Sequence, residues 1–134
     1  MDWYWIFGMM LFCHVIEDFH LQGILADMKQ KCWWCNQFTE YGKGLKPNTM
    51  KKYDKDYIVA LLMHGFEWSV FVHIPMMWFY GFEPIIFASI IINALVHSFV
   101  DDLKCNKMMT NLIQDQILHI IQIAVTVAIV TVVL

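Results

Sequence analysis

Histidine and aspartate residues recur four positions apart in this sequence, and no other pattern in it points as directly to chemistry. Three such pairs occur, namely His14 with Asp18, His97 with Asp101, and Asp115 with His119. Residues four apart lie on one face of a helix, one turn after the other, so both side chains of a pair can reach one metal ion. Alternatively, the carboxylate can orient the imidazole. His64 and Glu67 form a further pair, three apart, and inward-facing Glu/His pairs of this spacing build metal sites in helical bundles.

Imidazole and carboxylate ligands together favour zinc, with manganese or iron as alternatives, over calcium, which prefers oxygen alone. Bound zinc would act as a Lewis acid that activates water. The candidate metal ligands are His14, Asp18, His64, His97, Asp101, Asp115 and His119. These are more ligands than one tetrahedral ion requires, so either two ions bind or some groups only orient the others. The candidate catalytic carboxylates are Asp18, Asp101 and Asp115, and one that does not bind the metal would act as a general base.

The elements that must position these groups are membrane helices. Of the 134 residues 59% are hydrophobic and 16% are charged, whereas soluble domains are about 45–50% apolar and about 25% charged. The sequence predicts an all-α, polytopic membrane protein: one membrane domain over 1–134 that is a four-transmembrane-helix bundle. The expected spans are about 3–26, 57–80 (interrupted by Pro75), 85–103 and 111–134, each with the roughly 20 residues that cross a bilayer core. Residues 81–84 are expected to form a tight turn.

Lysine placement predicts the orientation in the membrane. Seven of the nine basic residues, all lysines, fall in the linker 27–56, and Lys104 and Lys107 fall between the third and fourth spans. Both connections lie on one side of a four-span protein, so that side is expected to be cytoplasmic and both termini outside. We expect a multi-pass protein of the cell's inner (plasma) membrane. A net charge of −3 without a basic stripe argues against nucleic acid as a partner.

Counting from the expected cytoplasmic ends places all four polar pairs in the cytoplasmic half of the membrane. Ionisable groups inside membrane segments are costly to keep and indicate functional sites. A purely structural reading stays open, because His/Asp pairs can also hold helices together by hydrogen bonds. Outside the pairs, Asp102 is expected to be solvated or to pair with Lys104, His20 to orient the site or lie at the interface, and His73 to be packed or interfacial. For Glu17 the spacing leaves the position ambiguous.

Cys32 and Cys35 have the spacing of a metal or redox motif. A second Cys-x-x-Cys and a βαβ pattern, which would support either role, are both missing from the sequence. We therefore expect reduced thiols on a cytoplasmic loop.

Three short motifs together resemble a known family. They are the His14-to-Gln22 stretch that includes Asp18, Phe19 and Leu21, the His97/Asp101/Lys104 stretch, and the Asp115/Gln116/His119 stretch. In order and spacing they resemble the small bacterial and phage membrane proteins catalogued as domain of unknown function 3307. The resemblance covers the four spans but not the linker. It implies a polar core of His14, Asp18, Gln22, His64, His97, Asp101, Asp115, Gln116 and His119. The family has no established activity and is only distantly similar to membrane-bound metal-dependent hydrolases.

Three functions fit these observations. The leading hypothesis is a metal-dependent hydrolase that acts on a membrane-embedded substrate, such as a lipid or lipid-linked phosphate at the cytoplasmic leaflet. The first alternative is a proton or metal-ion transporter or channel that uses the same His/Asp cluster as a relay, as a homo-oligomer. The second is a non-catalytic small membrane effector, in which the cluster is packing.

Overall fold

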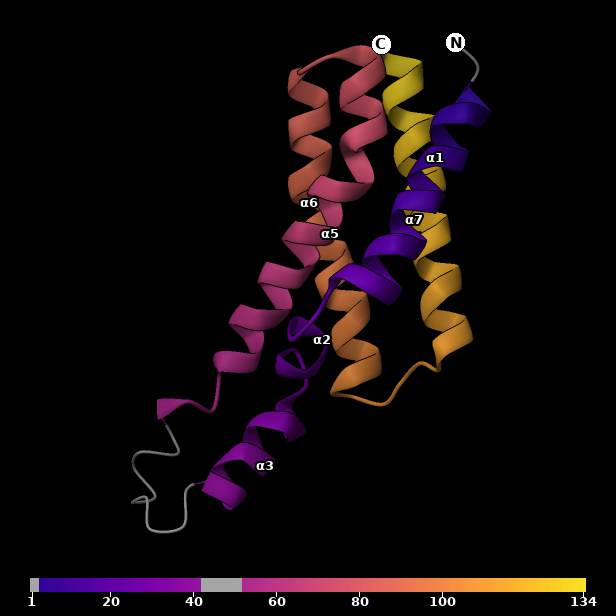
Figure 1. Ribbon diagram of the computed structural model, residues 1–134. Helices are drawn as coiled ribbons and strands as arrows, with labels where there is room; N and C mark the ends of the chain where they lie inside the picture. The colour runs from indigo at the N-terminus through magenta and orange to yellow at the C-terminus, as the bar shows by residue number, and fades with distance from the viewer. Residues whose placement is uncertain (1–2, 42–51) are drawn as a thin grey trace.

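The protein is all-helical over the residues that the computed structural model describes, which are 3–41 and 52–134. The helices are α1 (Trp3–Ile16), the π-helical turn η1 (Glu17–Leu21), α2 (Leu25–Met28), α3 (Lys31–Tyr41), α5 (Asp56–Tyr80), α6 (Pro84–Cys105) and α7 (Leu112–Val133) (Figure 1). Lys43, Lys46 and Lys51 of the expected cytoplasmic linker lie outside the described residues.

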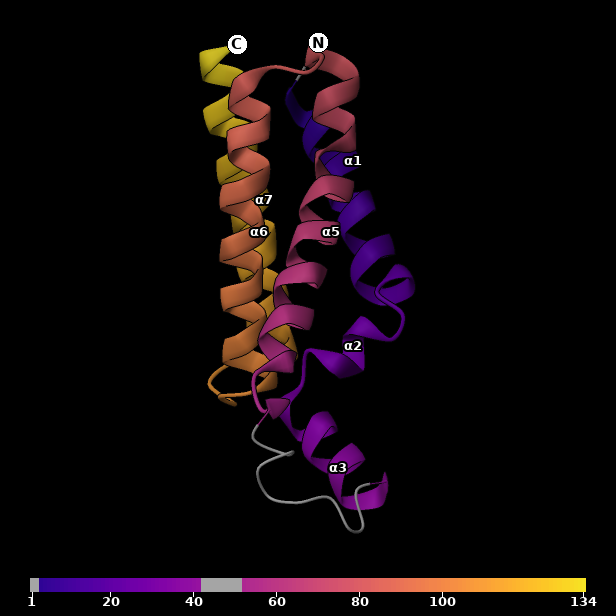
Figure 2. The same ribbon diagram turned by 90° about the vertical axis from the view of Figure 1, so that its left-hand side faces the viewer.

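Four helices form an elongated bundle. α1 and α6 each pack against both α5 and α7, so the four close into a ring. The first turn of α1 and the last turn of α7 lie at the same end as the α5–α6 turn (Figures 1 and 2). The α6–α7 turn, α2 and α3 lie at the opposite end. This arrangement agrees with the expected connections, although the side of the membrane on which each end lies stays a prediction.

Three helices of the described chain, α5, α6 and α7, are long and apolar enough to cross a membrane. Their outward faces carry large apolar side chains that are more than half exposed, including Val59, Ile92 and Ile121. Such a continuous apolar surface is unusual on a soluble protein and fits contact with lipid. The expected multi-pass membrane protein is therefore supported. α1 has 14 residues and is not among the three, so the count of four spans stays a prediction.

The ends of the long helices follow from local sequence signals. Pro84 occupies the first turn of α6, where a missing N–H costs nothing. Asn111 and Gln114 form a reciprocal capping box at the start of α7. Gly81 adopts a φ of +79°, which ends α5 and begins the expected tight turn. The expected interruption at Pro75 is wrong, because α5 continues through it to Tyr80. Packed neighbours in a membrane bundle make an internal proline tolerable.

The expected continuous helix over 3–26 also needs correction. The α-helical geometry ends at Ile16, a π-helical turn follows to Leu21, and Gly23 then takes a φ of +49°. Since a left-handed residue cannot continue a helix, the chain turns there and α2 packs against α5. This turn returns the residues after Gly23 to the bundle, and the site depends on it.

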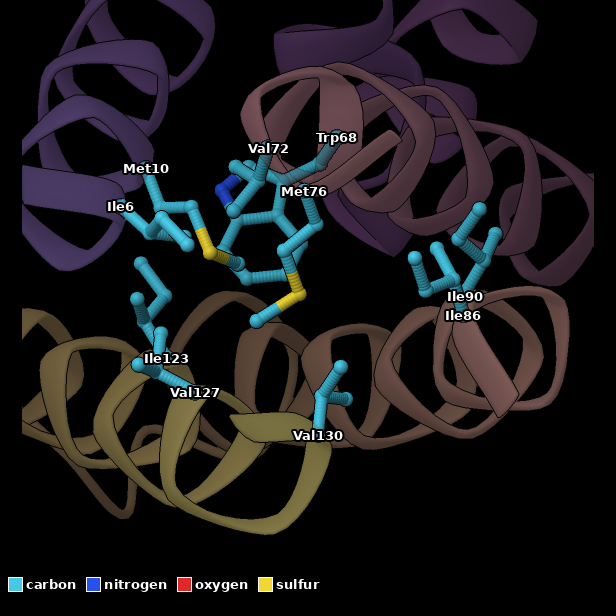
Figure 3. Packing of buried hydrophobic residues seen from close by; sticks show 10 residues of the cluster. All are labelled: Ile6, Met10, Trp68, Val72, Met76, Ile86, Ile90, Ile123, Val127 and Val130. Carbon is cyan, nitrogen blue, oxygen red and sulfur yellow. The ribbon is translucent and has the colours of Figure 1, made fainter. Parts of the chain in front are cut away.

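Each bundle helix presents one stripe of inward residues at steps of three or four. Every stripe is apolar toward the end with the α5–α6 turn and polar toward the other end. The stripes are Ile6–Met10–His14–Asp18, Met76–Val72–Trp68–His64, Ile86–Ile90–Ala94–His97–Asp101 and Val127–Ile123–His119–Asp115. The apolar halves form the core in Figure 3, where Met10, Trp68 and Ile123 point toward one another across the bundle. The polar halves therefore converge in a second layer.

α5 and α6 approach each other closely at Gly65. A Cβ atom on Gly65 would overlap with Ser98 Oγ and lie 2.7 Å from the carbonyl oxygen of Ala94. Ser98 Oγ can donate to the carbonyl oxygens of Leu61, at 3.1 Å, or Ala94, at 2.8 Å. Small residues of this kind let membrane helices pack backbone to backbone. This contact sets the separation of the helices that carry His64 and His97.

We expect Gly65→Ala to lower the free energy of unfolding by about 1–3 kcal/mol, because the added methyl group must push α5 and α6 apart. Thermal unfolding in detergent measures the change. Gly8→Ala in α1 is the matched control, since its Cβ would meet nothing within 4 Å. Equal stability of the Gly65 and Gly8 variants would contradict the close approach.

Candidate metal centre

The polar layer gathers ionisable side chains from every part of the bundle. Nine are buried there, with at most 8% of each residue exposed: His14, Glu17, Asp18, Lys29, His64, His97, Asp101, Asp115 and His119. They come from α1, η1, the end of α2, α5, α6 and α7. Burying so many ionisable groups is costly unless they neutralise one another or bind an ion.

His64, His97 and Asp101 meet at the middle of the cluster. The Nε2 atoms of the two imidazoles are 3.1 Å apart. Asp101 Oδ2 lies 3.3 Å from His64 Nε2 and 3.8 Å from His97 Nε2. Asp18 Oδ1 approaches from η1, at 3.8 Å from His64 Nε2 and 4.0 Å from His97 Nε2. Ligating atoms from three helices therefore face one small volume.

His119 and Asp115 extend the cluster on α7. His119 Nε2 is 3.4 Å from Asp101 Oδ1 and 3.6 Å from Asp115 Oδ1. The ring of His119 also stacks on that of His97, with centroids 4.1 Å apart. Asp101 thus lies between the histidines of α5 and α6 on one side and that of α7 on the other.

Several of these atoms lack a hydrogen-bond partner among the described residues. They include Asp18 Oδ1, Asp101 Oδ1, Asp115 Oδ1 and His119 Nε2, all of which are buried. A buried polar atom without a hydrogen-bond partner costs about 1–3 kcal/mol, so four converging ones require an explanation. Mixed imidazole nitrogen and carboxylate oxygen is a donor set suited to a transition metal. The residues therefore fit a metal ion.

Three overlapping groups could hold such an ion in the described chain. They are Asp18/His64/His97, His97/Asp101/His119 and Asp18/Asp115/His119, with the ligating atoms of each group within 4.8 Å of one another. Asp18, His97 and His119 each belong to two groups. This sharing allows either one ion or two neighbouring ions.

Glu17 lies behind His64. Its Oε1 atom is 3.6 Å from His64 Nδ1, and both of its carboxylate oxygens lack hydrogen-bond partners. A carboxylate facing the outer nitrogen of a metal-ligating histidine fixes the ring and its tautomer, leaving Nε2 for the metal. Glu17 and Asp18 are neighbours in sequence, yet both are buried. They lie in the π-helical turn, a local widening that is frequent at functional sites.

His14 is held by hydrogen bonds on both ring nitrogens. The indole Nε1 of Trp68 donates to His14 Nδ1 at 2.9 Å, so Nε2 carries the proton and donates to Gln116 Oε1 at 3.1 Å. The amide nitrogen of Gln116 donates to Asp18 Oδ2 at 2.9 Å and to Asp115 Oδ2 at 3.2 Å. The series of hydrogen bonds from Trp68 through His14 to Gln116 therefore orients the carboxylates of Asp18 and Asp115 and leaves their Oδ1 atoms facing the cluster.

Two lysines bind carboxylates of the cluster. Lys29 Nζ lies 2.6 Å from Asp101 Oδ2, and Lys104 Nζ lies 2.7 Å from Asp115 Oδ2. Four carboxylates (Glu17, Asp18, Asp101 and Asp115) thus face two ammonium groups. When all four are ionised and the histidines are neutral, as metal ligands are, two negative charges stay unbalanced, which favours a divalent cation.

The structure brings all seven sequence-predicted ligands into one layer. Six of them belong to the metal-holding groups, whereas His14 does not and has both nitrogens occupied by Trp68 and Gln116. The three candidate catalytic carboxylates, Asp18, Asp101 and Asp115, all lie in the cluster. Their catalytic roles stay a prediction.

Other expectations met mixed outcomes. Of the two alternatives for Asp102, pairing with Lys104 is wrong, because Asp102 pairs with Lys107 at 3.0 Å and Lys104 with Asp115. Asp102 is partly exposed. Glu67 is exposed and lies outside the metal-holding groups. His20 is exposed, and Gln22 donates to the backbone oxygen of Asp18.

His73 is buried, with Nδ1 2.7 Å from the carbonyl oxygen of Ser69, as expected of a packed histidine. The four cysteines, all described, form no disulfide.

Sequence reasoning missed Lys29 and left Glu17 ambiguous. A lysine count assigns Lys29 to the linker, and only the turn at Gly23 returns it to the cluster. The sequence signal that could have indicated this turn is Gly23 itself, directly after the Asp18–Gln22 motif.

Comparison with protein-family models, with curated proteins and with solved structures finds no match to this chain.

We expect Glu17→Ala to weaken zinc binding roughly 10- to 100-fold, because His64 loses the carboxylate that orients it. Glu17→Gln should weaken it less, since an amide oxygen still accepts from His64 Nδ1. Competition with a fluorescent zinc chelator measures both affinities. Glu67→Ala is the control, as Glu67 is exposed. Unchanged affinity in Glu17→Ala would contradict the orienting role.

Proposed function

We propose that this protein is a multi-pass inner-membrane protein with a catalytic metal centre, and that it hydrolyses a membrane-embedded substrate. One observation carries the proposal: six ligating side chains from four helical segments converge, and three of their carboxylate oxygens lack hydrogen-bond partners. The ligands are Asp18, His64, His97, Asp101, Asp115 and His119. Zinc is the metal that this donor set suits best, with manganese and iron as alternatives.

The roles of the protein's own residues follow from their contacts. His64, His97 and His119 supply imidazole nitrogens, and Glu17 holds His64 in position. Gln116 directs Asp18 and Asp115. Bound zinc would supply Lewis-acid polarisation of the substrate and activation of water. Asp101 lies between the imidazole groups, and whichever of Asp18 and Asp115 does not bind the metal would accept a proton from water as the general base.

Hydrolysis fits the layered interior better than transport does. Apolar side chains fill the bundle between the polar layer and the end with the α5–α6 turn, among them Ile6, Met10, Val72, Met76 and Val127. A relay across the membrane would need a continuous path of polar groups through that layer. The buried polar side chains there bond locally instead, His73 to the backbone of Ser69 and Asn93 to Thr126. A structural role alone would not explain why these carboxylate oxygens lack hydrogen bonds, since packing would favour their being hydrogen-bonded.

Membership in the family catalogued as domain of unknown function 3307 stays part of the proposal. It is supported by the convergence of the three motifs that carry the resemblance, through Asp18, Asp101 and His119. It is likewise part of the proposal that the end of the bundle with the lysine-rich linker and the α6–α7 turn lies on the cytoplasmic side. Together these would place the centre near the inner leaflet, within reach of a lipid substrate.

Metal content is the direct test of this centre. Protein purified in detergent and exposed to zinc should retain about one or two equivalents by elemental analysis. His97→Ala and His119→Ala should lose most of this metal, because each removes a ligand shared by two metal-holding groups. His20→Ala, which changes an exposed histidine, should retain it.

A wild-type protein that stays metal-free after addition of zinc or manganese would overturn the proposal. If His97→Ala and His119→Ala retain as much metal as the wild type, the metal binds outside the His/Asp cluster. Circular dichroism of each variant separates loss of a ligand from loss of the fold.

A further inference from the structure

An apolar groove lies on the outer surface between α6 and α7. Its volume is about 490 Å³, within the roughly 300–1,000 Å³ typical of sites for small molecules. Ile85 and Ile129 line it toward one end of the bundle, and Val100 and Leu118 line it toward the other. Ile92 and Ile121 on its walls are 61% and 52% exposed, so the groove faces the surroundings of the bundle.

One wall of the groove runs toward the end of the bundle that holds the candidate metal centre. Val96, Val100 and Lys104 follow one another at four-residue steps on α6, so Lys104 continues the groove wall by one turn. Leu118, on the opposite wall, directly precedes His119, whose side chain is buried inside the bundle instead. The apolar wall on α6 therefore ends one turn before Lys104, which binds Asp115 of the cluster.

Lys104 is partly exposed at this end of the groove and binds Asp115 of the cluster. Its side chain is 29% exposed, and its Nζ atom lies 2.7 Å from Asp115 Oδ2. An ammonium group on a flexible stem at the end of a membrane helix reaches the depth of lipid headgroups. Ammonium groups are also effective phosphate ligands.

The polar groups at the floor of the groove largely satisfy one another. Asn93 Nδ2 donates to Thr126 Oγ1 at 2.9 Å, and Gln122 Nε2 donates to Asn93 Oδ1 at 2.8 Å. Thr126 Oγ1 can in turn donate to the carbonyl oxygen of Gln122 at 2.9 Å. These bonds tie α6 to α7 and leave the groove walls to hydrocarbon contacts.

We propose that this groove binds the hydrocarbon chain of a lipid phosphate, with the phosphate at Lys104 beside the metal centre. The apolar walls match the chain, and the cation where they end matches the headgroup charge. As an identification of the substrate, this inference rests on the proposed function. As a binding site, it can be tested without metal.

The test uses n-dodecyl phosphate and metal-free protein in phosphatidylcholine nanodiscs, with retained ligand read by native mass spectrometry. Ile92→Trp should lower the apparent affinity about tenfold or more, because the indole fills the groove. Ile91→Trp is the matched control: Ile91 is 55% exposed on the same helix but does not line the groove. Its binding should equal that of the wild type.

The binding of the phosphate headgroup is tested by comparing dodecyl phosphate with uncharged dodecanol. Lys104→Gln should abolish the preference for dodecyl phosphate over uncharged dodecanol, and Lys104→Arg should restore it. A preference that survives in Lys104→Gln would overturn the assignment of the phosphate to Lys104.

Equal binding by the Ile92 and Ile91 variants would overturn the groove as the chain site. If Ile92→Trp instead converts a dimer into a monomer and leaves ligand retention unchanged, the groove is a contact between copies of this chain and the proposal is wrong. His97→Ala separates this inference from the proposed function, since it should lose metal and still retain dodecyl phosphate.

Discussion

The structure depends on the cost of burying carboxylates in an apolar bundle. Glu17, Asp18, Asp101 and Asp115 lie where water cannot solvate them, and an unpaired charge in such a place is strongly destabilising. Lys29 and Lys104 each neutralise one carboxylate, and Gln116 donates to two. The carboxylate oxygens that remain without hydrogen bonds point toward His64, His97 and His119. A divalent cation among them would offset the charge that the lysines leave.

Four local features of the fold serve this layer. The π-helical turn buries both Glu17 and Asp18, and the left-handed Gly23 returns Lys29 to the cluster. Gly65 lets α5 approach α6 so that His64 and His97 meet. Trp68 closes the layer from the apolar side, with its indole 4.0 Å from the His97 ring and its N–H bound to His14. The apolar half of the bundle thus acts as the support on which the site is built.

Much of this organisation can be predicted from the sequence, because it rests on local periodicity. About 20 apolar residues define α5, α6 and α7, and four-residue spacing places His97 with Asp101 and Asp115 with His119 on shared faces. What escapes prediction depends on several segments at once. The role of His14 requires Trp68 and Gln116 from two other helices, and that of Lys29 requires a backbone turn. The π-helical turn after Ile16 likewise has no signal in the hydrophobic pattern.

The central claim is that the His/Asp layer, and not Cys32 and Cys35, is where this protein binds metal. X-ray absorption at the zinc edge of the zinc-loaded wild-type protein tests it most directly. The account predicts only nitrogen and oxygen neighbours at about 2.0–2.2 Å, with the multiple-scattering signature of imidazole. Sulfur neighbours at about 2.3 Å would assign the metal to the cysteines and contradict the account.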